Sequence, residues 1–88
     1  MLATEYIFQV GGWDHGPGKA AAAAALLPWG CTVFICGDYQ TEAALPAAAE
    51  VAEALVGREI KRLSLLSFGG VGPRLARAVG QLKQSIST

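Results

Sequence analysis

The sequence predicts an α/β domain in which three strands alternate with three helices. Short runs of β-branched and aromatic residues recur along the chain, and each is followed by glycine and then by an alanine- or leucine-rich stretch. Strands that alternate with helices pair in parallel, because each helix carries the chain back through a right-handed crossover. At 88 residues the chain is expected to form one domain, residues 1–88.

The first strand is expected at Tyr6–Val10, where aromatic and β-branched residues dominate. After a glycine-rich loop, Pro17 suits the first turn of a helix, and the alanines that follow favour a helix over Lys19–Leu27. The next strand, Thr32–Cys36, is continuously apolar, as strands buried in parallel sheets are. This first half of the chain therefore reads as strand, helix, strand.

A second helix is expected to begin before Pro46 and to stop at Gly57. The third strand is Arg62–Phe68, and Pro73 opens the last helix. Apolar residues recur there at helical spacing, namely Leu75, Val79, Leu82 and Ile86.

Three parallel strands can be ordered in several ways, and we expect the order 2-1-3, which is half of a doubly wound sheet with flanking helices. This order creates a topological switch point between the first and third strands, where ligands bind at the carboxyl ends of the strands. The two glycine-rich turns, Gly11–Gly12 and Gly69–Gly72, would then face each other.

Composition bears on the partners of the chain. The sequence is 52% hydrophobic and 16% charged, which is more apolar surface than so small a monomer buries, and this favours a homo-oligomer or a complementary chain. Acids precede Ile60 and all bases but Lys19 follow Gly57. The basic end has no interleaved aromatic residues, so nucleic acid is not an expected partner.

The two cysteines and the long uncharged stretch point to a cytoplasmic protein. Cys31 and Cys36 are an odd number of positions apart in one strand, so they point to opposite faces and cannot pair. Without a histidine cluster they form no zinc site, and we expect no metal. Free thiols fit a reducing cytoplasm. Pro28 and Gly30 interrupt the uncharged residues 20–37, so no membrane partner is expected.

The first turn permits a phosphate-binding interpretation. Residues 16–21 match a loose G-x-G-x-x-A, and Asp38 follows about twenty residues later, as in dinucleotide sites. The glycines come well after the strand, however, and Trp13 occupies the first glycine position of a Walker loop. The alternative is a loop that needs unusual backbone angles.

The second turn carries a more specific motif. Leu66-Ser67-Phe68-Gly69-Gly70 resembles the G-x-S-x-G nucleophile elbow of α/β-hydrolases, although Leu65 stands at the first glycine. Gly12-Trp13 is similar to the oxyanion turn of that superfamily, and the Cys-Gly-Asp-Tyr segment 36–39 is similar to one in the small biotin-pathway esterases that act on pimeloyl-acyl-carrier-protein methyl ester.

The resemblance implies that Ser67 is the nucleophile and that the N–H groups of Phe68 and Trp13, next to Gly12, form the oxyanion hole. It also implies an acyl ester substrate, carried on a carrier protein in that family, a role in biotin biosynthesis, and no cofactor. The fold class would then be half of an α/β-hydrolase-like sheet.

The general base of such a site is missing from the expected place. In this superfamily the acid and the histidine follow the serine, and the residues after Ser67 include no Asp, Glu or His. His15, the only histidine, and Asp38 are the accessory candidates. The chain is therefore expected to be an incomplete N-terminal half of an esterase. The competing hypothesis is a non-catalytic binding or assembly module with a cleft that accepts an anion or a nucleotide.

Overall fold

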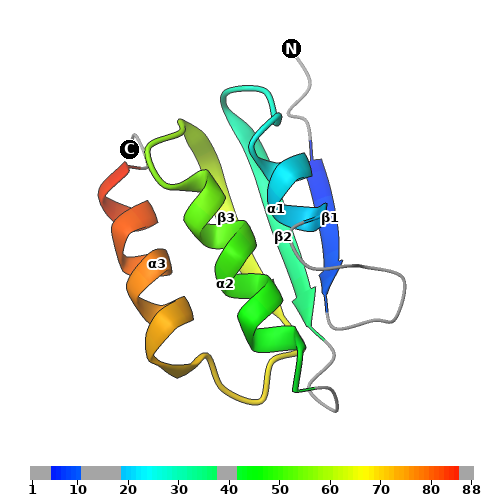
Figure 1. Cartoon of the computed structure of the whole chain (residues 1–88). Helices are drawn as coiled ribbons and strands as arrows, with labels where there is room; N and C mark the ends of the chain where they lie inside the picture. The colour runs from blue at the N-terminus through cyan, green and yellow to red at the C-terminus, as the bar shows by residue number, and fades with distance from the viewer. Residues whose placement is uncertain (1–4, 11–18, 38–41, 86–88) are drawn as a thin grey trace.

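A computed structural model of the chain describes residues 5–10, 19–37 and 42–85 (Figure 1). The strands are β1 (Glu5–Val10), β2 (Cys31–Gly37) and β3 (Ile60–Leu66). The helices are α1 (Lys19–Ala24), α2 (Ala44–Leu55) and α3 (Gly72–Ser85). Strands and helices alternate and both strand pairs are parallel, so the predicted α/β class is confirmed.

The strand order is β1-β2-β3, and the expected order 2-1-3 is wrong. The central place goes to β2, the strand with the most continuous apolar run, in which Val33 and Ile35 are fully buried. A central strand is flanked on both sides, so apolar side chains gain most there. The outer strands carry the charged and polar residues that an edge tolerates, namely Glu5, Gln9, Lys61 and Arg62.

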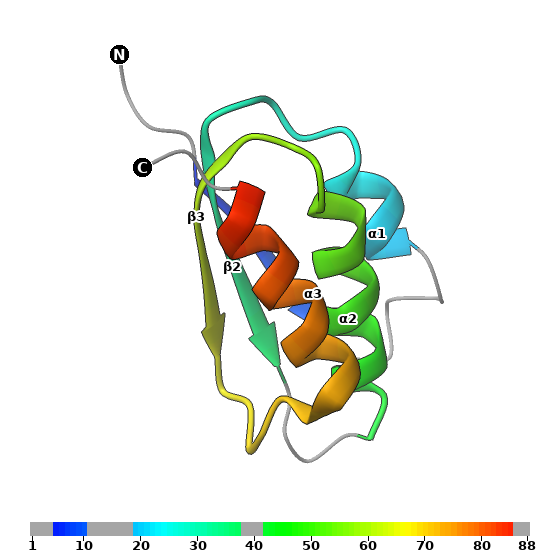
Figure 2. The same cartoon turned by 90° about the vertical axis from the view of Figure 1, so that its left-hand side faces the viewer.

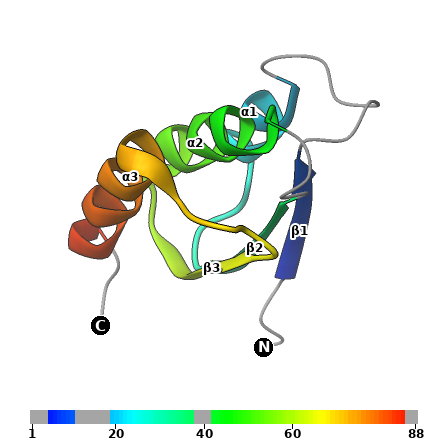
Figure 3. The same cartoon turned by 90° about the horizontal axis from the view of Figure 1, so that it is seen from below.

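All three helices lie on one face of the sheet (Figures 2 and 3). The strand order explains the placement of α1 and α2: when each strand is added on the same side of the last, right-handed crossovers place every connecting helix on the same face. The last helix, α3, follows β3 and packs beside α2. The order 2-1-3 would have put helices on both faces. The described part of the chain therefore has two layers, a sheet and a row of helices, with α2 packed between α1 and α3.

The core lies between the two layers and depends on α2. The buried side chains of this helix are small except for Leu55, so α2 packs closely against its neighbours: Ala44, Ala48, Ala49, Val51, Ala52 and Leu55. Leu75 and Leu82 of α3 complete the core from one side. After α2, Gly57 adopts a φ of 85°, a left-handed conformation that suits glycine and confirms the predicted helix stop.

Two side-chain interactions tie the elements together, one exposed and one partly buried. Arg74 of α3 donates two hydrogen bonds to the Glu53 carboxylate of α2, with N–O distances of 2.9 and 2.7 Å. These bonds hold the pKa of Glu53 below its usual value. Arg58 donates to the carbonyl of Leu27, which joins the turn before β3 to the turn after α1. Within the described ranges, no helix has both the length and the hydropathy to span a membrane.

Truncating Leu55 tests the importance of the α2 core contact. Leu55 is 0% exposed, so Leu55→Ala is expected to lower the free energy of unfolding by about 2–5 kcal/mol. Leu26 is 85% exposed, and Leu26→Ala is expected to change the free energy of unfolding by less than about 0.5 kcal/mol. Urea unfolding followed by circular dichroism measures both variants. Equal effects of the two would contradict the core described above.

Candidate functional site

In the described part of the chain, all helices lie on one side of the sheet (Figures 2 and 3), and the sheet face that points away from them is here called the open face. Residues paired in a parallel register send their side chains to the same side of the sheet. The register therefore arranges nine residues of the open face in three rows: Glu5, Thr32 and Arg62; Ile7, Phe34 and Ser64; Gln9, Cys36 and Leu66.

The open face is apolar at its centre and charged at one end. Ile7 is 66% exposed and Leu66 is 44% exposed, and between them Phe34 is half-buried on the central strand. At the amino-terminal end of the strands, Glu5 lies on one edge of the sheet and Arg62 on the other. Contiguous exposed apolar side chains with a polar rim are typical of an interaction surface.

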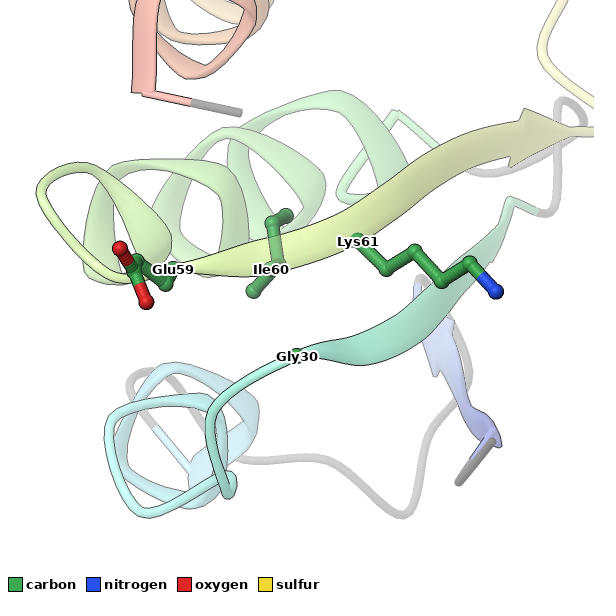
Figure 4. Close-up of a pocket in the computed structure, with 4 residues that line it drawn as sticks. All are labelled: Gly30, Glu59, Ile60 and Lys61. Atoms are coloured by element: carbon green, nitrogen blue, oxygen red, sulfur yellow. The ribbon is translucent and has the colours of Figure 1, made fainter. Parts of the chain in front are cut away.

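A bulge adds positive charge at the β3 edge of the open face. The register shifts between Cys31 and Thr32, which leaves Lys61 as an extra residue between Ile60 and Arg62. Figure 4 shows the Lys61 side chain running along the sheet between β3 and β2. The hollow of about 240 Å³ beside it is lined by Gly30, Glu59, Ile60 and Lys61. This volume is below the usual range for small-molecule sites.

Ser67, the predicted nucleophile, follows β3 directly and is exposed. Its φ is 62°, and in the described part of the chain no other residue besides glycine has a positive φ. A strained serine between a strand and a helix is the geometry of a nucleophile elbow. In such an elbow the helix starts at once, whereas α3 begins only at Gly72.

The neighbour of Ser67 explains why the chain turns sharply here. The Phe68 ring lies so close against the end of β2 that a Cβ added to Gly37 would collide with it. Phe68 is half-buried and packs on the core. The left-handed conformation of Ser67 thus lets the chain leave β3 and close the carboxyl end of the sheet with Phe68. The strain has a structural cause as well as a catalytic interpretation.

The remaining predicted site residues lie outside the described residues: Gly12, Trp13, His15 and Asp38. The expectation that the turns after β1 and β3 face each other rested on the order 2-1-3. In the observed order β2 stands between these strands, so Val10 and Leu66 at their ends are two strand spacings apart, or about 10 Å. The strand order therefore gives no support to an oxyanion hole shared by Trp13 and Phe68.

The cysteines point to opposite faces of β2, as predicted. Cys31 is buried against the helices, and this burial raises the pKa of its thiol, which keeps the sulfur protonated and unreactive. Cys36 is half-buried and its register partners place it on the open face. The described residues contain no group of three His, Cys, Asp or Glu side chains able to hold a metal ion.

Comparisons of the chain with protein-family models, with curated proteins and with solved structures found no match. The resemblance to the biotin-pathway esterases therefore rests on the short motifs alone. The open face was not foreseen from the sequence. The sequence signal for it was limited to the polar Glu5 and Gln9, four positions apart in β1 and therefore on one face with Ile7; the exposed-to-buried alternation along residues 5–10 comes from the structure.

Replacing Ser67 by glycine tests the left-handed turn. Ser67→Gly is expected to raise the free energy of unfolding by about 0.5–1 kcal/mol, because glycine adopts a positive φ without strain. The matched control is Ser64→Gly, three residues earlier within β3. It is expected to lower the free energy of unfolding by about 0.5–1 kcal/mol, because glycine weakens the interior of a strand. Thermal and urea unfolding measure both. A loss of stability at both positions would contradict the strained conformation of Ser67.

Proposed function

We propose that this chain is an association module that binds another protein surface through its open face. The observation that supports this most directly is the exposure of Ile7 and Leu66 beside Phe34 on a parallel sheet that has helices on only one side. Parallel sheets are almost always covered on both faces, because their strands are apolar on both. A partner surface would supply the second cover.

The energetics favour such a role. Fully burying one exposed aliphatic side chain contributes about 1.5–3 kcal/mol, so covering the apolar residues of the open face is a substantial driving force for association. The high apolar fraction of the chain agrees with this. The version of this module that accepts an anion or a nucleotide depends on residues 11–18, which lie outside the described ranges, and on Lys19, which is exposed at the start of α1.

Site-specific photocrosslinking in the cells that make the protein tests the association module. Benzoylphenylalanine at position 7, on the open face, is expected to give a covalent adduct. The same group at position 26, where the native leucine is more exposed than Ile7, lies in the turn just after α1 in the helix layer and is expected to give none. Leu66→Glu, which places a charge on the open face, should abolish the adduct at position 7. If neither position 7 nor position 26 gives an adduct, or if both give it equally, the proposed association through the open face is wrong.

A second candidate function is supported by the backbone of Ser67. We propose that, with a base supplied by His15 or by a complementary chain, Ser67 is the nucleophile of an esterase-like site for acyl esters. Its exposed hydroxyl, its φ of 62° and its position after a parallel strand support this. A serine without a base is a weak nucleophile, so the site needs the additional group.

A fluorophosphonate probe tests this second candidate. The probe reacts with an activated serine only, so labelling of the protein is expected, and Ser67→Ala should abolish it. Ser64→Ala is the matched control, because Ser64 lies in β3 on the open face, and labelling should persist. Intact mass spectrometry measures both variants. If the protein, alone or with its crosslinked partner, takes up no probe, the nucleophile assignment is wrong.

A further inference from the structure

We infer that the surface that covers the open face is a second copy of this chain, packed sheet to sheet about a two-fold axis that runs parallel to β2. This inference rests on the proposed association module and names its partner. It is carried by the arrangement of charge on the open face, which pairs opposite charges about this axis and not about the two-fold axis at right angles to the strands.

The complementarity follows from the register of the strands. Glu5 on β1 and Arg62 on β3 share a row, with Thr32 of β2 between them. Two strand spacings, about 10 Å, separate the two charged residues within one chain. When a second copy is turned about an axis parallel to β2, its β3 lies over β1 and its β1 lies over β3. Glu5 of each copy then faces Arg62 of the other, which gives two ion pairs.

The other rows fit the same axis. Phe34 lies on the axis and meets its own counterpart, so the two aromatic rings form the centre of the interface. Ile7 lies over Ser64 of the other copy, and Gln9 lies over Leu66. No two like charges oppose each other in the three rows. Lys61 lies at the bulge outside these rows, beside Arg62, and so adds its positive charge on the side that lies over β1 and Glu5 of the other copy. The apolar centre and charged rim are the usual anatomy of a protein interface.

The alternative two-fold axis, at right angles to the strands, fails on charge. It would reverse the order of the rows, so that Glu5 faces Gln9 of the other copy and Arg62 faces Leu66. Both charges would lose water without gaining a partner of opposite sign, which is costly. Sheets packed face to face keep their strands within about 30° of each other, and the long Glu and Arg side chains can span that angle.

The size of the open face sets the strength of the dimer. Three strands about 5 Å apart and six residues long form a face of roughly 15 by 20 Å. This is smaller than the roughly 800 Å² that each partner buries in a standard interface. We therefore expect a reversible dimer whose population rises with protein concentration.

Sedimentation equilibrium of the purified chain with reversed charges tests the inference. The unaltered chain is expected to dimerise, and Glu5→Arg or Arg62→Glu alone should weaken the dimer about tenfold or more, because two attractions become two repulsions. An equimolar mixture of the two variants should dimerise again. In that mixture the new arginine at position 5 of one variant faces the new glutamate at position 62 of the other, and the unaltered Arg62 faces the unaltered Glu5.

The control uses an equal change of charge away from the open face. Arg77 is exposed on α3, in the helix layer. Arg77→Glu alone should leave the dimer unchanged. In an equimolar mixture with Glu5→Arg, the Arg77→Glu chains should dimerise with themselves while the Glu5→Arg chains stay weakly associated, although the net charges are the same as in the complementary mixture. Far-ultraviolet circular dichroism of each variant checks that the fold is intact.

The position of Cys36 gives an independent measure of the axis. Cys36 lies on β2, so the two copies of this residue meet near the axis, whereas the other axis would place Cys36 over Thr32. The shortest bismaleimide reagent should link two chains through Cys36. Cys36→Ser should abolish the link, and Cys31→Ser should not, because Cys31 is buried in the core.

Three results would overturn the dimer. The first is a monomer at all concentrations, the second is a dimer indifferent to Glu5→Arg and Arg62→Glu, and the third is failure of the complementary mixture to associate. If position 7 nevertheless crosslinks to a different protein, the open face is an association site and only its occupant was wrong. If position 7 gives no adduct, the association module itself fails.

Discussion

The central position of β2 governs the rest of the structure. Val33 and Ile35 of this strand are completely buried beneath the helices, and β2 is hydrogen-bonded to a neighbour on both sides. Because β2 follows β1 and precedes β3, the strands are added in sequence order and the connecting helices collect on one face. The two-layer form, the core around α2 and the open face are all consequences of this one placement.

The same placement separates two regions that the motifs would have joined. With β2 in the middle, the carboxyl ends of β1 and β3 are not neighbours, so the glycine turn after β1 and Ser67 after β3 are not brought together by the sheet. At the end of β3 the local geometry instead serves packing, since Phe68 closes the core against Gly37. The positive φ of Ser67 therefore has a sufficient cause without catalysis, which is why we rank the association module first.

The open face connects composition to function. The high apolar fraction of the sequence is reflected in the exposed side chains of Ile7 and Leu66. Glu5 and Arg62, with opposite charges on opposite edges of the sheet, favour one orientation of a partner on this face. Apolar side chains supply the driving force for association, whereas charged pairs select the orientation of the partner and penalise others. Spacing alone places Glu5, Ile7 and Gln9 on one face of β1, but it does not say which face the helices cover.

The sequence alone determined the alternation of strands and helices, the stop at Gly57 and the opposite faces of Cys31 and Cys36. These features depend on local preferences and on the periodicity of side chains, which act within a few residues. The sequence placed Ser67 within a strand ending at Phe68, whereas β3 ends at Leu66. The tertiary structure alone decided the strand order, because both orders satisfy every local preference and differ in long-range features: which strand receives two neighbours, and whether the helices cover one face of the sheet or both. It also decided the conformation of Ser67, which follows from contact between Phe68 and Gly37, residues that lie far apart in the chain. The paired glycine turns were visible from the residues, but whether they meet was a question of long-range packing.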